Sequence, residues 1–375
     1  MKRLMELLKP LEHKFKALFF KTLSPLLKKG RADFSAIDGT KISKVLFLRP
    51  EKIGDMVISL PVFDGLHQSF PDIKISILGS PKNLPLIKDD PRFDKIFLYR
   101  KSIWQDPGTM LRIRKEKFDC VIDMICDDSV TALFLSQFLA PGKPRIGVGK
   151  NKFRQYYDFN YDHRMNNTGH IIDNTLKLLN AFDIDLSEVS EFAPPFLSDQ
   201  SIRKSSEFFN NLAGSGTAEL RVGINISAGS PTRVWQTGKF VALINSILKS
   251  RRQAQVIIFS MPDERGRAAE IISKCDSKVF LIPGGLSLED VSAIIAKLDV
   301  LITPDTSLVH IARAFKVQVV GLYTRFMKNF LLWKPFGQES GTVVSDNDDN
   351  IHDITHEQVY AEFMKVSELK QAVGQ

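Results

Sequence analysis

The segment from residue 300 to residue 323 constrains the fold of this chain more than any other. It opens with an apolar run at 300–302, which has the length and composition of a buried strand. Helix-capping residue types follow, then apolar residues at helical spacing, and then a second apolar run at 317–322. Strand, helix and strand in this order predict a βαβ unit, in which both strands are parallel and buried.

The turn at the start of this helix is a candidate site for an anion. Asp305, Thr306 and Ser307 are residue types that cap helices, and His310 lies on the first helical turn. The free amides and the dipole of a helix N-terminus favour an anionic group such as a diphosphate. The alternative is that these residues only cap the helix and that His310 packs in the core.

The same alternation of strands and helices runs through most of the chain, and it predicts parallel sheets covered by helices on both faces. In the first half, the predicted strands are 45–48, 73–78, 95–98, 120–124 and 145–147, and the predicted helices are 56–68, 110–116, 130–139 and 170–179. In the second half, the further strands are 222–226, 256–259 and 279–281, and the helices are 201–212, 238–250, 265–274, 287–297 and 355–369. Pro61 should kink or interrupt the first of these helices.

A second strand-to-helix junction lies near the start of the chain. The apolar run 45–48 leads into the loop Ile53-Gly54-Asp55, and an apolar helix with Pro61 follows. Together with Asp305-Thr306-Ser307-x-x-His310, this loop resembles the signatures of the ADP-heptose–lipopolysaccharide heptosyltransferase family. The resemblance covers about residues 42–340 in the expected order, including Phe118-Asp119, 121–123, 223–235 and Trp333-x-Pro335.

This resemblance implies an α/β chain of GT-B fold, in which two Rossmann-like domains face each other across a cleft. We therefore divide the 375 residues, which suit two domains of about 150 residues, into five parts. These are a basic amphipathic extension at 1–40, an N-terminal acceptor domain at 41–192, a linker at 193–220, a C-terminal nucleotide-sugar donor domain at 221–350 and a C-terminal helix at 351–375. In this architecture we expect the C-terminal helix to pack back across the cleft.

The resemblance also implies inverting, metal-independent transfer of heptose from ADP-heptose to a lipopolysaccharide core acceptor. Asp55 would be the general base that deprotonates the acceptor hydroxyl, a role that contributes about 10²–10⁴-fold in rate; the alternative is that Asp55 only caps the helix that follows it. The residues expected to bind the donor are Ser227, Arg233, Asp305, Thr306, Ser307 and His310. Lys52, beside the base, is a candidate contact for an acidic group of the acceptor.

Two of these positions depart from the family pattern. Arg233 stands where lysine is frequent, which keeps the charge but offers a forked donor in place of a point charge. Ser307 stands where glycine normally lets a backbone amide approach the diphosphate closely. These departures leave open a related transferase that uses another nucleotide sugar or glycan. Two further alternatives are a nucleotide-sugar-binding or scaffold protein without catalytic activity, and a sugar-nucleotide epimerase.

The first 40 residues carry nine Lys/Arg and four Asp/Glu, so they hold +5 of the net charge of +8. Within 1–35, clusters of leucine and phenylalanine stand among lysines, which is typical of basic amphipathic helices at an anionic membrane surface. The alternative is a helix packed on the body or on a second subunit. We do not expect nucleic acid as a partner, because neither a recognition motif nor aromatic interleaving on a sheet is evident.

Cofactors, metals and membrane spans are not expected. Three cysteines without a Cys-x-x-Cys pair argue against disulfides or a zinc ribbon, and no apolar run reaches about 18 residues. Asp183-Ile-Asp185 has the spacing of a metal-binding Asp-x-Asp but follows a predicted helix, so we interpret it as a turn, and 346–350 as a solvated loop. We expect a cytoplasmic protein that contacts the inner face of the cytoplasmic membrane peripherally.

Overall fold

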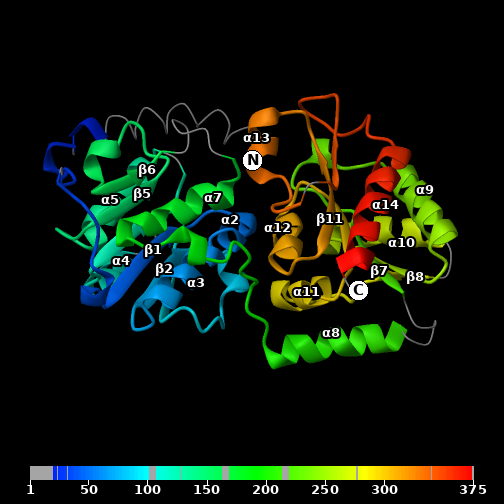
Figure 1. Cartoon of the computed structure of the whole chain (residues 1–375), viewed down its shortest axis with the longest axis horizontal. Helices are drawn as coiled ribbons and strands as arrows, with labels where there is room; N and C mark the ends of the chain where they lie inside the picture. Colours follow the sequence, from blue (N-terminus) through cyan, green and yellow to red (C-terminus); the bar gives the residue numbers. More distant parts are fainter. Residues whose placement is uncertain are drawn as a thin grey trace.

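The computed structural model describes residues 20–22, 24–31, 33–100, 107–126, 128–162, 169–212, 219–275, 278–338 and 340–373. Two six-stranded sheets form the centre of this part of the chain (Figure 1). All neighbouring strands in both sheets are parallel, as the alternating pattern predicts.

The first sheet has the strand order β3-β2-β1-β4-β5-β6. Its strands are β1 (Lys44–Arg49), β2 (Lys74–Gly79), β3 (Lys95–Leu98), β4 (Cys120–Asp123), β5 (Arg145–Val148) and β6 (Phe159–Tyr161). This is the order of a doubly wound nucleotide-binding sheet, and the winding direction reverses between β1 and β4.

The second sheet repeats this topology, with the order β12-β11-β10-β7-β8-β9. Its strands are β7 (Leu220–Asn225), β8 (Ala254–Phe259), β9 (Val279–Leu281), β10 (Val300–Pro304), β11 (Gln318–Tyr323) and β12 (Thr342–Val344). Winding reverses between β7 and β10, so two copies of one architecture follow each other along the chain.

Helices cover both sheets. In the first half these are α2 (Ile53–Val57), α3 (Leu60–Ser69), α4 (Pro107–Lys115), α5 (Val130–Leu139) and α7 (Ile171–Leu176). In the second half these are α8 (Asp199–Leu212), α9 (Thr237–Ser250), α10 (Arg265–Ser273), α11 (Leu288–Ile295), α12 (Ser307–Ala314), α13 (Met327–Trp333) and α14 (His356–Val373).

Most predicted elements are present, with three kinds of difference. The predicted helix 56–68 is interrupted at Ile58–Ser59, and α3 restarts with Pro61 in its first turn, where a missing N–H is tolerated. The predicted helix 170–179 is α7 followed by a 3₁₀ turn at Lys177–Phe182. Three short elements, β6, α13 and β12, were not predicted: β6 and β12 are strands of three residues and α13 is a helix of seven, and segments this short carry little periodic signal.

The two halves share a hydrophobic core. One cluster of buried side chains includes Phe47 and Ile122 of the first sheet together with Val309, Ile311 and Val319 of the second half. The C-terminal helix belongs to the second half alone: Val359 and Phe363 of α14 pack into the core formed by α9 and the second sheet, on the side far from the first sheet (Figure 1). The expectation that this helix crosses the cleft is therefore wrong.

The predicted N-terminal extension is described only in part, since residues 1–19 lie outside the described residues. From residue 20 onward the segment lies on the first half, where Phe20 packs 4.9 Å from Phe153, centroid to centroid. The predicted boundaries at 40, 192, 220 and 350 stay predictions.

Candidate active site

The candidate residues lie where the winding of each sheet reverses. Asp55 follows β1 in the first sheet, and Ser227 and Asp305 follow β7 and β10 in the second. Ligands of open α/β sheets bind beyond the carboxyl ends of strands at such switch points. The topology therefore places the candidates of both halves at ligand-binding edges.

Helices α2 and α12 bring these two edges into contact (Figure 1). A Cβ atom added at Gly54 would lie 3.0 Å from Cδ2 of His310 and 3.8 Å from Cα of Ser307. The absence of a side chain at Gly54 thus permits the close approach of the two helices. This contact is a physical reason for glycine in the Ile53-Gly54-Asp55 loop.

Asp55 is the third residue of α2, and its side chain is 13 % exposed. Its Oδ2 accepts a hydrogen bond from the backbone N–H of Lys52 at 2.9 Å, so the carboxylate does cap the helix. Among the described residues, Oδ1 accepts no hydrogen bond and lies 3.8 Å from Nη2 of Arg49. Among the described residues, Oδ2 is therefore held by the helix cap, while Oδ1 accepts no hydrogen bond and has a long ion pair with Arg49, so capping does not exclude a chemical role. Lys52 itself is exposed.

Arg49, the last residue of β1, was missed by the sequence analysis. Its side chain is 1 % exposed; Nε donates to the carbonyl of Asp55 at 3.0 Å, and Nη1 donates to the carbonyl of Met124 at 2.5 Å. Nη1 also forms an ion pair with Glu51 at 2.5 Å. Burial lowers the pKa of Arg49, but the negative charges of Glu51 and Asp55 outweigh burial and raise the pKa overall. The sequence signal that could have identified Arg49 is its position as a charged residue at the end of an otherwise apolar strand.

A buried set of polar side chains lies beside Arg49. Asp123, which ends β4, accepts a hydrogen bond from the Tyr157 hydroxyl at 2.6 Å and pairs with Nζ of Lys150 at 2.8 Å. Burial, reinforced by the charge of Asp123, raises the pKa of Tyr157 well above its ordinary value, so the phenol keeps its proton. Burial also raises the pKa of Glu51, with Asp55 and Asp123 adding to the effect and Arg49 opposing it. The charges of Arg49, Asp55 and Asp123 therefore all act on the pKa of Glu51 at the carboxyl edge of the first sheet.

At the second edge, buried side chains hold the start of α12 in place. Thr306 caps this helix, because its Oγ1 accepts from the backbone N–H of Leu308 at 3.3 Å. Asn225, at the end of β7, donates from Nδ2 to Oγ1 of Thr303 at 2.9 Å and to the carbonyl of Ser227 at 3.1 Å. Asn225 and Thr303, both missed by the sequence analysis, thus tie the ends of β7 and β10 together.

Arg233 reaches the same helix start from the loop after β7. Its Nη1 forms an ion pair with Oδ2 of Asp305 at 2.5 Å, with 28 % and 15 % of the two side chains exposed. Ser227 is buried, and its hydroxyl accepts a hydrogen bond from the backbone N–H of Met261 at 2.8 Å. The structure therefore brings Arg233, Asp305, Thr306 and the N-terminus of α12 together, with Ser227 behind them.

His310 lies inside the interface between the halves. Its ring centroid is 5.6 Å from that of Trp333 and 6.5 Å from that of His170, which comes from the first half. Burial lowers the pKa of His310, although Asp305 and Asp55 oppose the shift, so the imidazole is neutral at neutral pH. His310 belongs to α12, and a Cβ at Gly54 of α2 would lie 3.0 Å from its ring, so the imidazole lies between the two edges.

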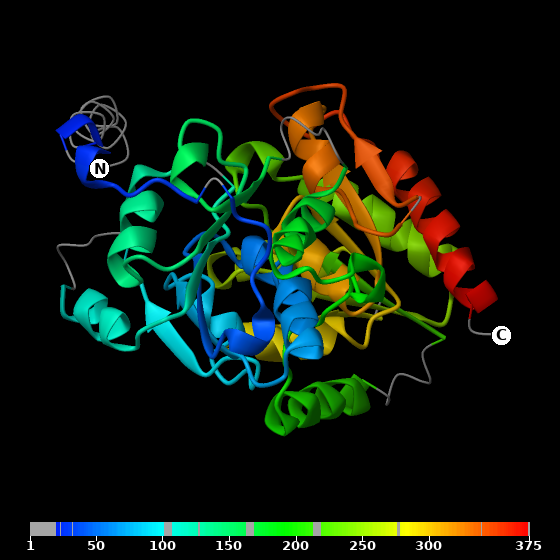
Figure 2. The same cartoon turned by 60° about the vertical axis from the view of Figure 1, so that its left-hand side comes forward.

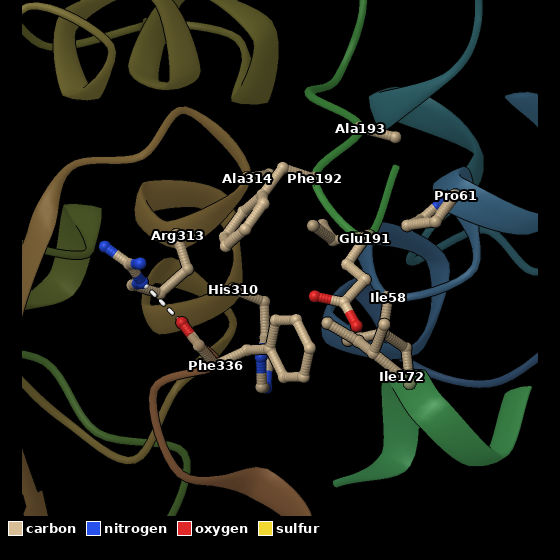
Figure 3. A pocket seen from close by; sticks show the side chains of 11 residues that line it. Ile58, Pro61, Ile172, Glu191, Phe192, Ala193, His310, Arg313, Ala314 and Phe336 are labelled. Atoms are coloured by element: carbon tan, nitrogen blue, oxygen red, sulfur yellow. Dashed lines mark hydrogen bonds between the residues drawn. The ribbon is translucent and has the colours of Figure 1, made fainter. Parts of the chain in front are cut away.

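A narrow crevice continues from His310 toward the connecting segment (Figure 3). Ile58 and Pro61 line one side of it and Arg313 lies on the other, while the carboxylate of Glu191 points into it. Burial, with a smaller effect of Asp173, raises the pKa of Glu191. Arg313 donates to the carbonyl of Phe336 at 2.8 Å within the second half, and its guanidinium lies 5.6 Å from the ring centroid of Phe192 across the crevice.

The remaining predicted acidic motifs are structural. Asp183 has a left-handed backbone (φ 56°) at the end of a 3₁₀ turn, and Asp185 caps the next turn by accepting from the N–H of Ser187 at 2.9 Å. This confirms the interpretation of Asp183-Ile-Asp185 as a turn. In the predicted loop at 346–350, Asp348 pairs with Arg325 at the surface.

Two parallel sheets of the same doubly wound topology, with ligand-binding edges that meet at one interface, define the GT-B class of glycosyltransferase folds. The model of glycosyltransferase family 9 (heptosyltransferase) matches residues 110–362, more than half of the chain. The chain belongs to this family and is a glycosyltransferase. The matched range includes every donor-side candidate, whereas Asp55 lies before it.

Known proteins agree with this assignment. Lipopolysaccharide heptosyltransferase 3 of Escherichia coli is 21 % identical over 298 residues, covering 76 % of this chain and 83 % of that protein. A family 9 glycosyltransferase structure from Veillonella parvula has a TM-score of 0.75 at 17 % identity, covering 89 % of this chain and 99 % of that one. The structure of an Escherichia coli heptosyltransferase with ADP-2-deoxy-2-fluoro heptose has a TM-score of 0.62 at 18 % identity, covering 86 % and 99 %.

Among the described residues, no helix is both long and apolar enough to cross a membrane.

Proposed function

We propose that this protein transfers heptose from ADP-heptose to a lipopolysaccharide core acceptor, with inversion at the anomeric carbon and without a metal ion. The observation that carries this proposal is the meeting of α2, with Asp55, and the start of α12 across the interface of the two halves. The similar heptosyltransferase with a bound ADP-heptose analogue supports the donor class, and the similar lipopolysaccharide heptosyltransferase supports the acceptor class.

In this proposal, Asp55 is the general base. Inversion requires a base on the face of the sugar opposite the leaving group, and Oδ1 of Asp55 has no hydrogen-bond partner among the described residues. The bond from Lys52 N–H to Oδ2 fixes the orientation of the carboxylate. The acceptor hydroxyl loses its proton to Asp55 as its oxygen bonds to the anomeric carbon and the bond to the diphosphate breaks.

The donor diphosphate would bind at the start of α12. The helix amides, the Thr306 hydroxyl and Arg233 supply the donors and positive charge that stabilise the leaving diphosphate. Arg233 is paired with Asp305 in this structure, so a bound diphosphate would compete with that carboxylate for the guanidinium. Ser307 and neutral His310 would complete the site beside the sugar, and Ser227 would support it from behind.

We further propose that residues 41–192 bind the acceptor, with Lys52 contacting an acidic group, and that 221–350 bind the donor. The lipid-linked, anionic acceptor fits a cytoplasmic protein that meets the inner face of the membrane through residues 1–35. The basic charge of this part of the chain supports that contact.

The decisive experiment compares the wild type with Asp55→Asn, because the asparagine oxygen can still accept the capping bond from Lys52. Calorimetric titration with ADP and UDP, without divalent metal, comes first, and transfer from ADP-heptose to a core acceptor follows. We expect selective ADP binding in both proteins and a loss of transfer of at least about 100-fold in the variant. NMR of the product should show the inverted anomeric configuration.

Other outcomes identify the alternatives. Selective UDP binding would keep the fold and favour transfer from another nucleotide sugar. Binding of neither nucleotide, with no transfer by the wild type, would favour a scaffold protein. Unchanged transfer in Asp55→Asn would show that Asp55 is only a cap.

A further inference from the structure

Three segments of the first half form one continuous surface, which we call the basic face. It consists of the segment 20–31, the last turn of α5 and helix α4, which follow one another along the side of the molecule opposite to α14 (Figure 2). Its exposed side chains are Lys21, Lys28, Lys29, Leu111, Arg112, Arg114, Lys115 and Phe138.

The last turn of α5 fixes the relative positions of the other two segments. Gln137 donates from Nε2 to the carbonyl of Lys28 at 3.0 Å and accepts at Oε1 from the N–H of Lys28 at 2.9 Å. The next residue, Phe138, accepts a hydrogen bond at its carbonyl from Arg114 of α4 at 3.2 Å. Because Gln137 and Phe138 are consecutive, the basic face is held together by hydrogen bonds.

A buried side chain also holds the backbone of Lys28 and Lys29. Buried Arg145 donates from Nη2 to the carbonyls of Lys28 and Lys29 at 3.2 and 3.3 Å. Their side chains nevertheless remain exposed. This pair of cations is therefore presented to the solvent from an ordered backbone.

The charge of the basic face is of one sign. Neither 20–31 nor 107–115 contains an aspartate or glutamate. Within the described part of the chain, none of the six lysine and arginine side chains named for this face forms an ion pair. These cations are therefore available to an external anion.

Two large apolar side chains stand among these cations. Leu111 is 53 % exposed and Phe138 is 40 % exposed. The guanidinium of Arg114 lies 4.8 Å from the ring centroid of Phe138, so this exposed ring carries a cation beside it. Exposed apolar groups surrounded by cations are typical of a surface that enters the headgroup region of an anionic bilayer.

We propose that the basic face docks on an anionic lipid bilayer, with Leu111 and Phe138 inserted among the headgroups and the surrounding lysines and arginines bound to lipid phosphates. This inference rests on the membrane contact of the proposed function and deepens it, because it extends the contact from residues 1–35 to the folded surface that 20–31 forms with α4 and the last turn of α5. Nucleic acid could bind to the same cations through its phosphates. Exposed leucine and phenylalanine side chains, however, gain free energy by inserting into a bilayer and gain little from a phosphate backbone, so they favour lipid.

The test is cosedimentation of the full-length protein with vesicles of phosphatidylcholine, with and without phosphatidylglycerol. Arg112→Gln/Lys115→Gln should weaken binding to the anionic vesicles about 30-fold, since each cation near such a surface contributes about a factor of five. Leu111→Ser/Phe138→Ser should weaken binding about tenfold and should lower retention at high salt, where the electrostatic attraction is screened. All four positions are exposed, so folding should be retained.

Ile202→Ser/Arg203→Glu on α8 is a matched control, because it removes an exposed apolar residue, 42 % exposed, and a cation from a different face. This variant should bind as the wild type does. Wild-type affinity of both basic-face variants would overturn the proposal, as would equal binding to neutral vesicles or release of the protein from vesicles by RNA. Transfer to a water-soluble acceptor should be unchanged in the basic-face variants, which separates failure of this inference from failure of the proposed function.

Discussion

At the scale of single residues, Arg49 shows how a buried charge can determine a site without being exposed in it. Its guanidinium contacts the carbonyls of Asp55 and Met124 and the carboxylate of Glu51, and its Nη2 forms a long ion pair with Oδ1 of Asp55 at 3.8 Å. Nη2 has no hydrogen-bond partner in the described structure. Arg49 therefore joins the end of β1, the loop after β4 and the candidate base.

We predict that Arg49→Met lowers the free energy of unfolding by about 3 kcal/mol, because it leaves the half-buried carboxylate of Glu51 without its cation. The double variant Arg49→Met/Glu51→Gln should recover part of this loss, since neither charge then remains unpaired. Urea denaturation of the wild type, both single variants and the double variant measures the coupling. Strictly additive effects of the two substitutions would argue against the ion pair.

At the scale of elements, the contact between α2 and α12 positions the two halves of the site. Helix α2 is only five residues long and follows β1, whereas α12 follows β10 in the other sheet. Their approach depends on Gly54, so the geometry of the candidate site depends on the short distance between the backbone of α2 and the side chain of His310 on α12.

We predict that Gly54→Ala lowers the rate of transfer about tenfold, because its Cβ would press on His310 at 3.0 Å and displace α12 by a few tenths of an ångström. Gly266→Ala in α10 is the control, since a Cβ there meets nothing within 4 Å. The control should keep both its rate and its stability, since the added methyl group meets no neighbouring atom. Steady-state kinetics and thermal denaturation check both variants; a Gly54→Ala rate equal to the wild type would contradict the packing argument.

At the scale of the whole molecule, His170 connects the two halves. Its Nε2 bonds to the carbonyl of Lys334 at 2.9 Å, and its Nδ1 accepts from the N–H of Ile172 at 3.1 Å, so the proton is on Nε2. Burial, with a smaller effect from His310, lowers the pKa of His170 from 6.5 to about 3. Protonation would remove the acceptor at Nδ1 and place a buried charge at the interface.

Between pH 6.5 and pH 3 the unfolded chain therefore binds a proton at His170 that the folded chain does not, so stability is lost as pH falls. We predict that proton uptake by His170 in the unfolded chain lowers the free energy of unfolding by about 1.4 kcal/mol when the pH falls from 7.5 to 5.5. Denaturant titrations at both pH values should show that His170→Gln is less sensitive to pH by that amount. The control His352→Gln changes an exposed histidine and should follow the wild type.

The sequence by itself determined the parallel α/β architecture and the position of each candidate along the chain. Buried parallel strands require continuous apolar runs, and helix starts require capping residues, so 300–302 and Asp305-Thr306-Ser307 carry local signals of their structure. Even the interruption near Pro61 was predictable, because proline acts through its own ring and missing N–H.

Only the tertiary structure decided which of these local features meet. The buried contacts of Arg49, Asn225 and His170 join segments that are distant in sequence, and side-chain partners at such separations leave no periodic trace. The packing of α14 was likewise not predictable. The sequence shows which of its residues are apolar, but not which part of the molecule these residues pack against. Periodicity and capping are properties of neighbouring residues, whereas the site depends on how two independently wound sheets pack against each other.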